Sequence, residues 1–182
     1  TWYTAGKIQE KIYNTENEKM YLQQAYDQAK FFGSLSKMFD YFLTCDSLEQ
    51  IPDAKGKVVA KYRPEMTDLL SRIRINLVSG GVTYFNENNN EKAFELFSKY
   101  IDVADAPMFA ALNYAETDSL MHEIAYYATL AGLKMEDYHK ALKYVDLAMK
   151  KEDVAQKAIE YKAMSYINLG DTASWINTLK LG

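Results

Sequence analysis

Apolar residues recur along this chain at intervals of three and four positions, and no stretch alternates cleanly over six residues. Leu70, Ile73 and Leu77 follow this spacing, and similar series recur before and after them. Such spacing places apolar side chains on one face of an α-helix, whereas a half-buried strand needs strict alternation. The pattern therefore predicts an all-α fold, with helices at residues 1–13, 22–45, 64–87, 90–104, 118–133, 136–150, 153–169 and 171–180.

Prolines and capping residues separate these predicted helices. All three prolines lie between the periodic stretches, where a residue without a backbone N–H is tolerated. The asparagines at 88–90 and the Gly-Asp pair at 170–171 combine a residue that tolerates left-handed dihedrals with one that caps the next helix. Residues 47–63 lack a clear period, so we predict a long loop there.

Composition narrows the class of protein. The chain of 182 residues has a formal net charge of −4, is 48% hydrophobic and contains 15 Tyr, 8 Phe and 2 Trp. This content excludes disordered and collagen-like chains, and the single cysteine, Cys45, excludes a disulfide scaffold. A slightly acidic chain has no global field that attracts nucleic acid or an anionic membrane. No window of 18 apolar residues is present to span a bilayer. We therefore expect no nucleic-acid partner and no transmembrane segment in this chain.

Small residues recur where the two helices of a repeated hairpin would cross. Gly81 lies four residues after Leu77 and three before Tyr84, and Ala93 and Phe97 have the matching spacing in the next helix. A small residue lets two helices approach closely, while large residues fill the flanking holes.

With these residues the chain resembles the tetratricopeptide (TPR) repeat family over nearly its whole length. Ala128 and Ala163 are 35 residues apart, close to the 34-residue period of that family. The resemblance implies a single domain, residues 1–182, folded as an α-α superhelix of about four degenerate helix hairpins with long inserted loops. The expected pairs are 1–46, 64–104, 118–150 and 153–181, with the long loop at 47–63 and a second insertion around Pro107. In the first pair, Leu35 and Phe39 would hold the places of Ala93 and Phe97. The alternative is an irregular helical domain with chance matches to the pattern.

Particular segments indicate a narrower likeness. Residues 1–6, 56–62 and 76–85 are similar to segments of uncharacterised bacterial TPR-like proteins, which often carry an export signal and an extra helix pair. That resemblance favours an exported or periplasmic protein of the cell envelope whose signal and first pair are missing, with a cytoplasmic location as the alternative. Truncated terminal repeats would leave Trp2 and Trp175 uncovered, so we expect the ends to pair with missing segments or to form a homo-oligomer.

Residues that carry chemistry are scattered along the sequence. His122 and Glu123 begin an HExxH zinc motif, but Tyr126 stands where the second histidine is needed. Cys45 ends an apolar helical face, which is typical of a core or rim residue. We therefore expect no catalytic residue, no metal site and no cofactor, and hence no enzyme.

One local run is basic despite the acidic total. Lys55, Lys57, Lys61 and Arg63 lie beside Tyr62. Interleaved basic and aromatic residues are typical of contacts with nucleic acid or an acidic partner. The net charge of the chain instead favours a solvated loop.

The resemblance also implies a binding surface. In TPR arrays the first helix of each pair lines a concave face that holds peptides or partner helices. The matching positions in this chain are Tyr3, Lys7, Val78, Val82, Phe85, Asn86, His122 and Thr129. Valines at 78 and 82 replace the polar groups of the chaperone-binding subclass, so a clamp for a C-terminal carboxylate is not supported. The alternative for each of these residues is packing against an inserted loop.

These observations predict a non-enzymatic scaffold that binds a protein or peptide. The alternative function is a carbohydrate-binding module that uses exposed aromatic rings. Repeat packing leaves four aromatic residues unexplained, and they are the first candidates for function: Tyr3, Tyr62, Phe85 and Tyr126.

Overall fold

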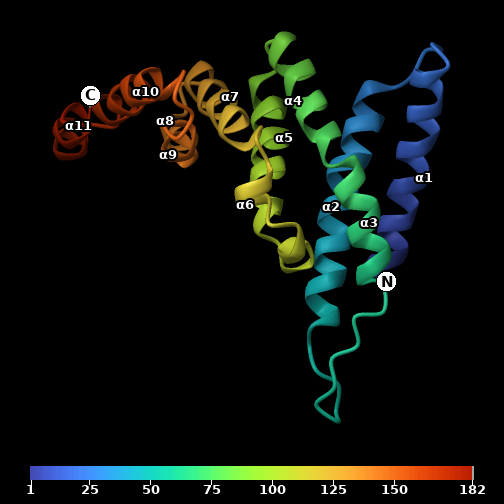
Figure 1. The fold of residues 1–182 in the computed structure, drawn as a ribbon. Coiled ribbons are helices and arrows are strands. Elements are labelled where there is room, and N and C mark those ends of the chain that lie inside the picture. Colours follow the sequence, from blue (N-terminus) through green and yellow to red (C-terminus); the bar gives the residue numbers. More distant parts are fainter. Residues whose placement is uncertain (182) are drawn as a thin grey trace. The chain divides into compact units, whose positions relative to one another are not determined.

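Helices make up nearly all of the regular structure in the computed structural model, which describes residues 1–181 (Figure 1). That part of the chain contains no strand, so the predicted all-α class is confirmed. None of its helices combines the length and apolar character needed to cross a membrane. In chain order the helices are α1 (Trp2–Tyr21), α2 (Gln28–Glu49), α3 (Arg63–Ile73), α4 (Ile75–Asn86), α5 (Asn90–Asp102), η1 (Val103–Asp105), η2 (Pro107–Leu112), α6 (Tyr114–Thr117), α7 (Met121–Lys134), α8 (Tyr138–Lys143), α9 (Val145–Ala148), α10 (Ala155–Asn168) and α11 (Thr172–Leu179).

The residues group into two compact units. Unit 1 comprises residues 1–77 and 105–112, and unit 2 comprises residues 78–104 together with residue 113 to the end of the described chain. The boundary falls inside α4, whose first three residues belong to unit 1. A continuous superhelix over residues 1–182 stays a prediction.

Unit 1 is built on a hairpin of α1 and α2, which lie side by side (Figure 1). Gly6 on α1 faces the buried ring of Phe42 on α2, and a methyl group at Gly6 would overlap that ring. Gly81 faces Phe97 in the same way. The first pair therefore uses Phe42 where the second uses Phe97, three residues later than the predicted Phe39. The core of α2 also includes Phe31, Leu35, Met38 and Phe39.

Helix α1 continues eight residues beyond its predicted end at residue 13. Its second half is polar, but the buried carboxylate of Glu16 accepts the backbone N–H of Asp27 at 2.8 Å and pairs with Lys19 at 2.7 Å. Asp27 in turn caps α2, because its side chain accepts the N–H of Lys30 at 2.9 Å. These contacts tie the end of α1 to the start of α2, which begins at Gln28 rather than at residue 22.

The predicted helix 64–87 is interrupted at Arg74, whose side chain is buried. The N–H of Leu77 bonds to the carbonyl of Arg74, only three residues back, at 3.0 Å. This 3₁₀-type bond interrupts the α-helical pattern, so α3 and α4 replace one long helix.

Two further differences concern the third predicted pair. Its second helix is split at Tyr144, which has φ −121° and donates its hydroxyl to Oδ1 of Asp102 at 2.7 Å. Lys143 binds the other carboxylate oxygen of Asp102 at 2.8 Å. The insertion around Pro107 folds into the short helices η1, η2 and α6, and α7 consequently begins at Met121 rather than at residue 118.

Three turns in unit 2 share one geometry. Each joins the first helix of a pair to the second through three residues, at 87–89, 135–137 and 169–171. The middle residue of each turn has a positive φ. The side chain of the third residue caps the next helix. The backbone N–H of that third residue also donates to the carbonyl five residues earlier, at 2.8–3.0 Å. This is a Schellman ending followed directly by an N-cap. The residues are Asn88 and Asn89, Glu136 and Asp137, and Gly170 and Asp171.

Helices α7 and α8 of the third pair approach each other closely at Gly132 of α7. A methyl group at this residue would lie 2.7 Å from Cα of Ala141 on α8 and closer still to its backbone nitrogen. Because the obstacle is backbone, it cannot rotate away as a side chain can. Ala128, one turn earlier on α7, is fully buried, as is Ala141.

We expect Gly132→Ala to lower the free energy of unfolding by about 1–3 kcal/mol, because overpacking a close contact costs that much. Urea unfolding followed by circular dichroism measures the change. The matched control is Gly33→Ala, since Gly33 lies inside α2 and an added methyl group would meet nothing within 4 Å. The control should gain about 0.5–1 kcal/mol from helix propensity. Equal effects in the two variants would contradict the role of Gly132.

We expect Glu136→Gly to raise the free energy of unfolding by about 0.5–1 kcal/mol. Glu136 has φ 56°, and the left-handed conformation costs a residue with a Cβ more than the extra chain entropy that glycine loses. The reverse change at the equivalent turn, Gly170→Ala, should lower stability by a similar amount, because Gly170 has φ 74°. Thermal unfolding of both variants tests this, and destabilisation by Glu136→Gly would show that the turn is not strained.

Candidate binding surface

Four partly exposed aromatic rings follow one another across the first helices of unit 2. Phe85 on α4 meets Tyr127 on α7 edge to face, with 5.8 Å between ring centroids and 78° between the planes. Tyr127 lies 6.0 Å from Tyr126, which in turn lies nearly parallel to Tyr161 on α10, at 6.0 Å and 27°. We call Phe85, Tyr127, Tyr126 and Tyr161 the aromatic row.

The buried ring of Phe97 on α5 supports one end of the aromatic row. Its centroid lies 6.4 Å from that of Phe85 and 6.1 Å from that of Tyr127. Gly81, one turn before Phe85, has no side chain, so the Phe97 ring packs directly on the backbone of α4. This close packing fills the space below Phe85 and Tyr127 and leaves both rings partly exposed.

At the other end of the aromatic row, the repeat explains the positions of Tyr126 and Tyr161. Tyr126 and Tyr161 are 35 residues apart, the same interval that separates Ala128 from Ala163. Both alanines are buried. Two tyrosines at equivalent positions of successive first helices are thereby placed next to each other, and their rings stack.

Two lysines lie over the rings at opposite ends of the aromatic row. Nζ of Lys134 is 4.1 Å from the centroid of Phe85, and Nζ of Lys157 is 5.6 Å from that of Tyr161. Both distances are within the range of a cation–π interaction. Lys157 also pairs with Glu160 at 2.9 Å. The surface therefore combines apolar ring area, phenol hydroxyls and ammonium groups.

The hydroxyl of Tyr126 is held in its neutral form. Burial, followed by hydrogen bonding with Tyr161 and the negative charge that Tyr161 and Tyr127 would carry if ionised, raises the pKa of Tyr126 to about 12. The group therefore remains protonated, and able to donate a hydrogen bond, at every pH below about 11.

Six of the eight predicted partner-binding residues lie in unit 2, and four of these are on α4. Val82 is 38% exposed, Asn86 is exposed and Val78 is partly exposed. With Phe85, these residues are spaced to lie along one stripe of the helix. The structure thus places this part of the predicted surface next to the aromatic row.

The two predicted residues of α7 differ in their surroundings. His122 is partly exposed and lies one turn before Tyr126. Thr129 is fully buried, and its hydroxyl donates to the carbonyl of Ala125 at 3.0 Å. The Thr129 side chain therefore packs in the core of unit 2.

The remaining two predicted residues, Tyr3 and Lys7, lie in unit 1. The ring of Tyr3 stacks on that of Tyr62 with 3.9 Å between centroids and 13° between planes, and its hydroxyl donates to Oε2 of Glu65 at 2.7 Å. Lys7 binds Oε1 of the same carboxylate at 3.0 Å. Tyr62 ends the loop between α2 and α3. The ring of Tyr3 thus packs against the last residue of the loop, whereas Lys7 pairs with a carboxylate of α3.

The remaining candidates, metal ligands and the single cysteine, lie within residues 1–181. The structure brings together no set of three or more His, Cys, Asp or Glu side chains suited to a metal ion in that part of the chain. Cys45 is buried, and burial together with the charge of Glu49 raises the pKa of its thiol above the ordinary value.

Sequence reasoning missed four residues of this surface: Tyr127, Tyr161, Lys134 and Lys157. A signal for Tyr161 was present, because its distance from Tyr126 equals the interval between the two matching alanines. Tyr127 had no such signal, since its place depends on the side chain of Phe85 on another helix. The lysines are ordinary residues of a helix surface until the rings below them are located.

We expect Tyr161→Phe to lower the pKa of Tyr126 from about 12 toward the ordinary value near 10, because the variant removes its hydrogen-bonding and ionisable neighbour. The raised pKa of Tyr126 contributes to the stability of the folded chain. This contribution is fully present below about pH 10, the pKa of tyrosine in the unfolded chain, and it is lost as the pH rises through about 12. NMR titration of tyrosines labelled at Cζ measures the pKa. Tyr3, whose pKa is also raised to about 12 by its bond to Glu65, is an internal control that should not change. An unchanged Tyr126 titration would contradict the contribution of Tyr161 and leave burial as the cause of the raised pKa.

Comparison with known proteins gives a match to one segment of the chain. Residues 122–165 match the family model described as Fis1 C-terminal tetratricopeptide repeat. Neither curated proteins nor solved structures match the chain. The matched segment includes the close approach at Gly132 and three rings of the aromatic row. The predicted repeat family is confirmed, while the narrower likeness to exported bacterial proteins stays a prediction. The match at residues 122–165 supports a TPR-like repeat in this segment of the chain.

Proposed function

We propose that the chain is a scaffold that binds a protein or peptide segment through the aromatic row of unit 2. TPR-like domains generally mediate protein interactions. The observation that carries the proposal is the series of four adjacent rings, all partly exposed, on the first helices of successive pairs. First helices are the elements with which repeat arrays of this class contact their partners.

The chemistry of the surface supports a polypeptide partner. Tyrosine and phenylalanine bring a large contact area at a low cost in side-chain entropy, and tyrosine adds a hydroxyl that can bond to a peptide group. Lys134 and Lys157 add positive charge at the two ends of the row. We therefore expect a segment with apolar side chains between acidic ones.

The ring geometry supports a polypeptide over the carbohydrate alternative. A sugar stacks on an aromatic face that is free. Tyr126 and Tyr161 lie nearly parallel at 6.0 Å, so each covers part of one face of the other, and Tyr127 meets Phe85 through an edge.

The test uses peptides selected by display against the whole chain and measures their affinity by calorimetry. Tyr161→Ala should weaken binding at least tenfold, because aromatic anchors at the centre of an interface contribute more than about 1 kcal/mol each. The matched control is Tyr166→Ala, a partly exposed tyrosine of the same helix outside the row, which should bind within about twofold of wild type. Circular dichroism checks that both variants fold.

The partner's acidic residues are tested separately. Lys134→Glu should weaken the same peptides, whereas Lys150→Glu, an exposed lysine outside the row, should not. Peptides that bind wild type and the row variants equally would remove the aromatic row as the binding surface. Binding of immobilised glycans that is lost in Tyr161→Ala, with no peptide selected, would establish the carbohydrate alternative.

A further inference from the structure

We propose that the tip of the loop between α2 and α3 binds the surface of an anionic lipid bilayer. The loop runs from residue 50 to residue 62, and Figure 1 shows it extending beyond the ends of both helices. We call residues 51–61 the loop tip. It belongs to unit 1 and shares no residue with the aromatic row.

The loop tip is a defined turn. Oδ1 of Asp53 accepts the N–H groups of Lys55 and Lys57 at 2.8 and 2.9 Å, and the N–H of Asp53 donates to the carbonyl of Lys57 at 2.9 Å. Gly56 supplies the positive φ of 76° that the turn needs. Lys55 and Lys57 are therefore held on one short turn around Asp53.

The base of the loop is anchored to α2. Arg63 binds the buried carboxylate of Asp46 through two bonds, at 2.5 and 2.9 Å, and Glu49 accepts the N–H of Tyr62 at 3.1 Å. The positive charge of Arg63 is thereby paired with the carboxylate of Asp46 inside unit 1. The lysines of the tip, in contrast, remain available to a partner.

Exposed aliphatic side chains accompany these lysines. Ile51, Val58 and Val59 are 63%, 43% and 54% exposed. Three exposed aliphatic side chains within the loop tip cost free energy in water, and burial in the apolar boundary of a lipid headgroup layer recovers this free energy. Basic residues next to exposed apolar ones are typical of segments that lie in that boundary.

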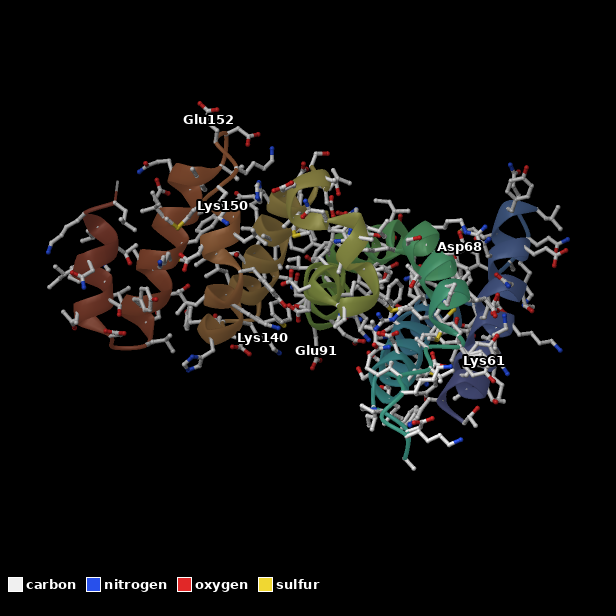
Figure 2. The ribbon with its side chains drawn as sticks, turned by 60° about the horizontal axis from the view of Figure 1, so that its bottom comes forward. Lys61, Asp68, Glu91, Lys140, Lys150 and Glu152 are labelled. Atoms are coloured by element: carbon white, nitrogen blue, oxygen red, sulfur yellow. The ribbon has the colours of Figure 1, made fainter. Side chains whose placement is uncertain are left out.

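The local charge of the loop tip has the sign that an anionic bilayer attracts. The loop tip contains three lysines, Lys55, Lys57 and Lys61, and a single acidic residue, Asp53, so its local charge is +2 on a chain whose net charge is −4. Lys61 lies at the α3 end of the tip (Figure 2), with Nζ 4.9 Å from the centroid of Tyr62. Charges more than about 8 Å away are largely screened at physiological ionic strength, so the local sign governs contact.

The structure favours a bilayer over nucleic acid. A single-stranded nucleic acid needs an aromatic face on which a base can stack. Tyr62 is the aromatic residue next to the basic run, and its ring is covered by Tyr3 at 3.9 Å. Ile51, Val58 and Val59 would also have no use in a phosphate contact.

The experiment is co-sedimentation of the whole chain with vesicles of phosphatidylcholine alone and of an equimolar mixture with phosphatidylserine. Wild type should bind the mixed vesicles and not the neutral ones. The double variant Lys55→Gln, Lys57→Gln should bind the mixed vesicles about 25-fold more weakly, since each lysine near an anionic surface is worth about fivefold in affinity. The matched control, Lys11→Gln with Lys37→Gln, removes the same charge from exposed residues of α1 and α2 and should bind as wild type does.

A second readout reports the apolar contact. Val59→Cys is labelled with a dye that is sensitive to its environment, because the native Cys45 is buried and labels slowly. Emission should shift to shorter wavelength with mixed vesicles only. All the variants replace exposed side chains, so their circular dichroism should equal that of wild type.

Several outcomes would overturn the proposal. These are wild-type binding that is equal on both kinds of vesicle, absence of binding to mixed vesicles, and equal weakening in the loop and control variants. Tighter binding of a single-stranded oligonucleotide than of mixed vesicles, lost in the loop variant, would assign the tip to nucleic acid instead.

Discussion

The hairpins depend on close approaches between helices at residues that have no side chain. Gly6 admits the ring of Phe42, Gly81 admits that of Phe97, and Gly132 lies against the backbone of α8. At this separation a turn of three residues is long enough to connect the helices in unit 2. The position of Phe97 then determines which neighbouring rings remain at the surface, so the packing inside a pair also shapes the candidate binding surface.

Much of the fold was predictable because its signals are local. The all-α class follows from the spacing of apolar residues, and the turns at Asn88 and Gly170 follow from residue types that accept left-handed dihedrals. The equivalent turn at Glu136 gave no such signal, because the residue adopts a conformation that its type disfavours. The second half of α1 was missed for another reason. Its polar sequence is tied down by Glu16 and Asp27, eleven positions apart, and periodicity does not register such a contact.

The candidate surface was predictable only where the repeat itself positions a residue. Phe85 and Tyr126 stood out because repeat packing did not explain them, and both belong to the aromatic row. Tyr3 and Lys7 hold formally similar places on α1, yet their side chains bind Tyr62 and Glu65. An inserted segment has no counterpart in the repeat pattern, so the pattern cannot show what that segment will cover.

In unit 2 the turns inside the pairs are constant in length, whereas the connections between the pairs are not. The turns inside the pairs of unit 2 keep the same length and hydrogen bonds, whereas the connections between pairs range from the short stretch 149–154 to the stretch 103–120 with its small helices. In this chain the length thus varies between hairpins, while the turn that joins the two helices of a hairpin stays the same. Each hairpin is in this sense an exchangeable module. A duplicated pair joined after α9 would carry its own first helix, and with it one more ring in line with Tyr161.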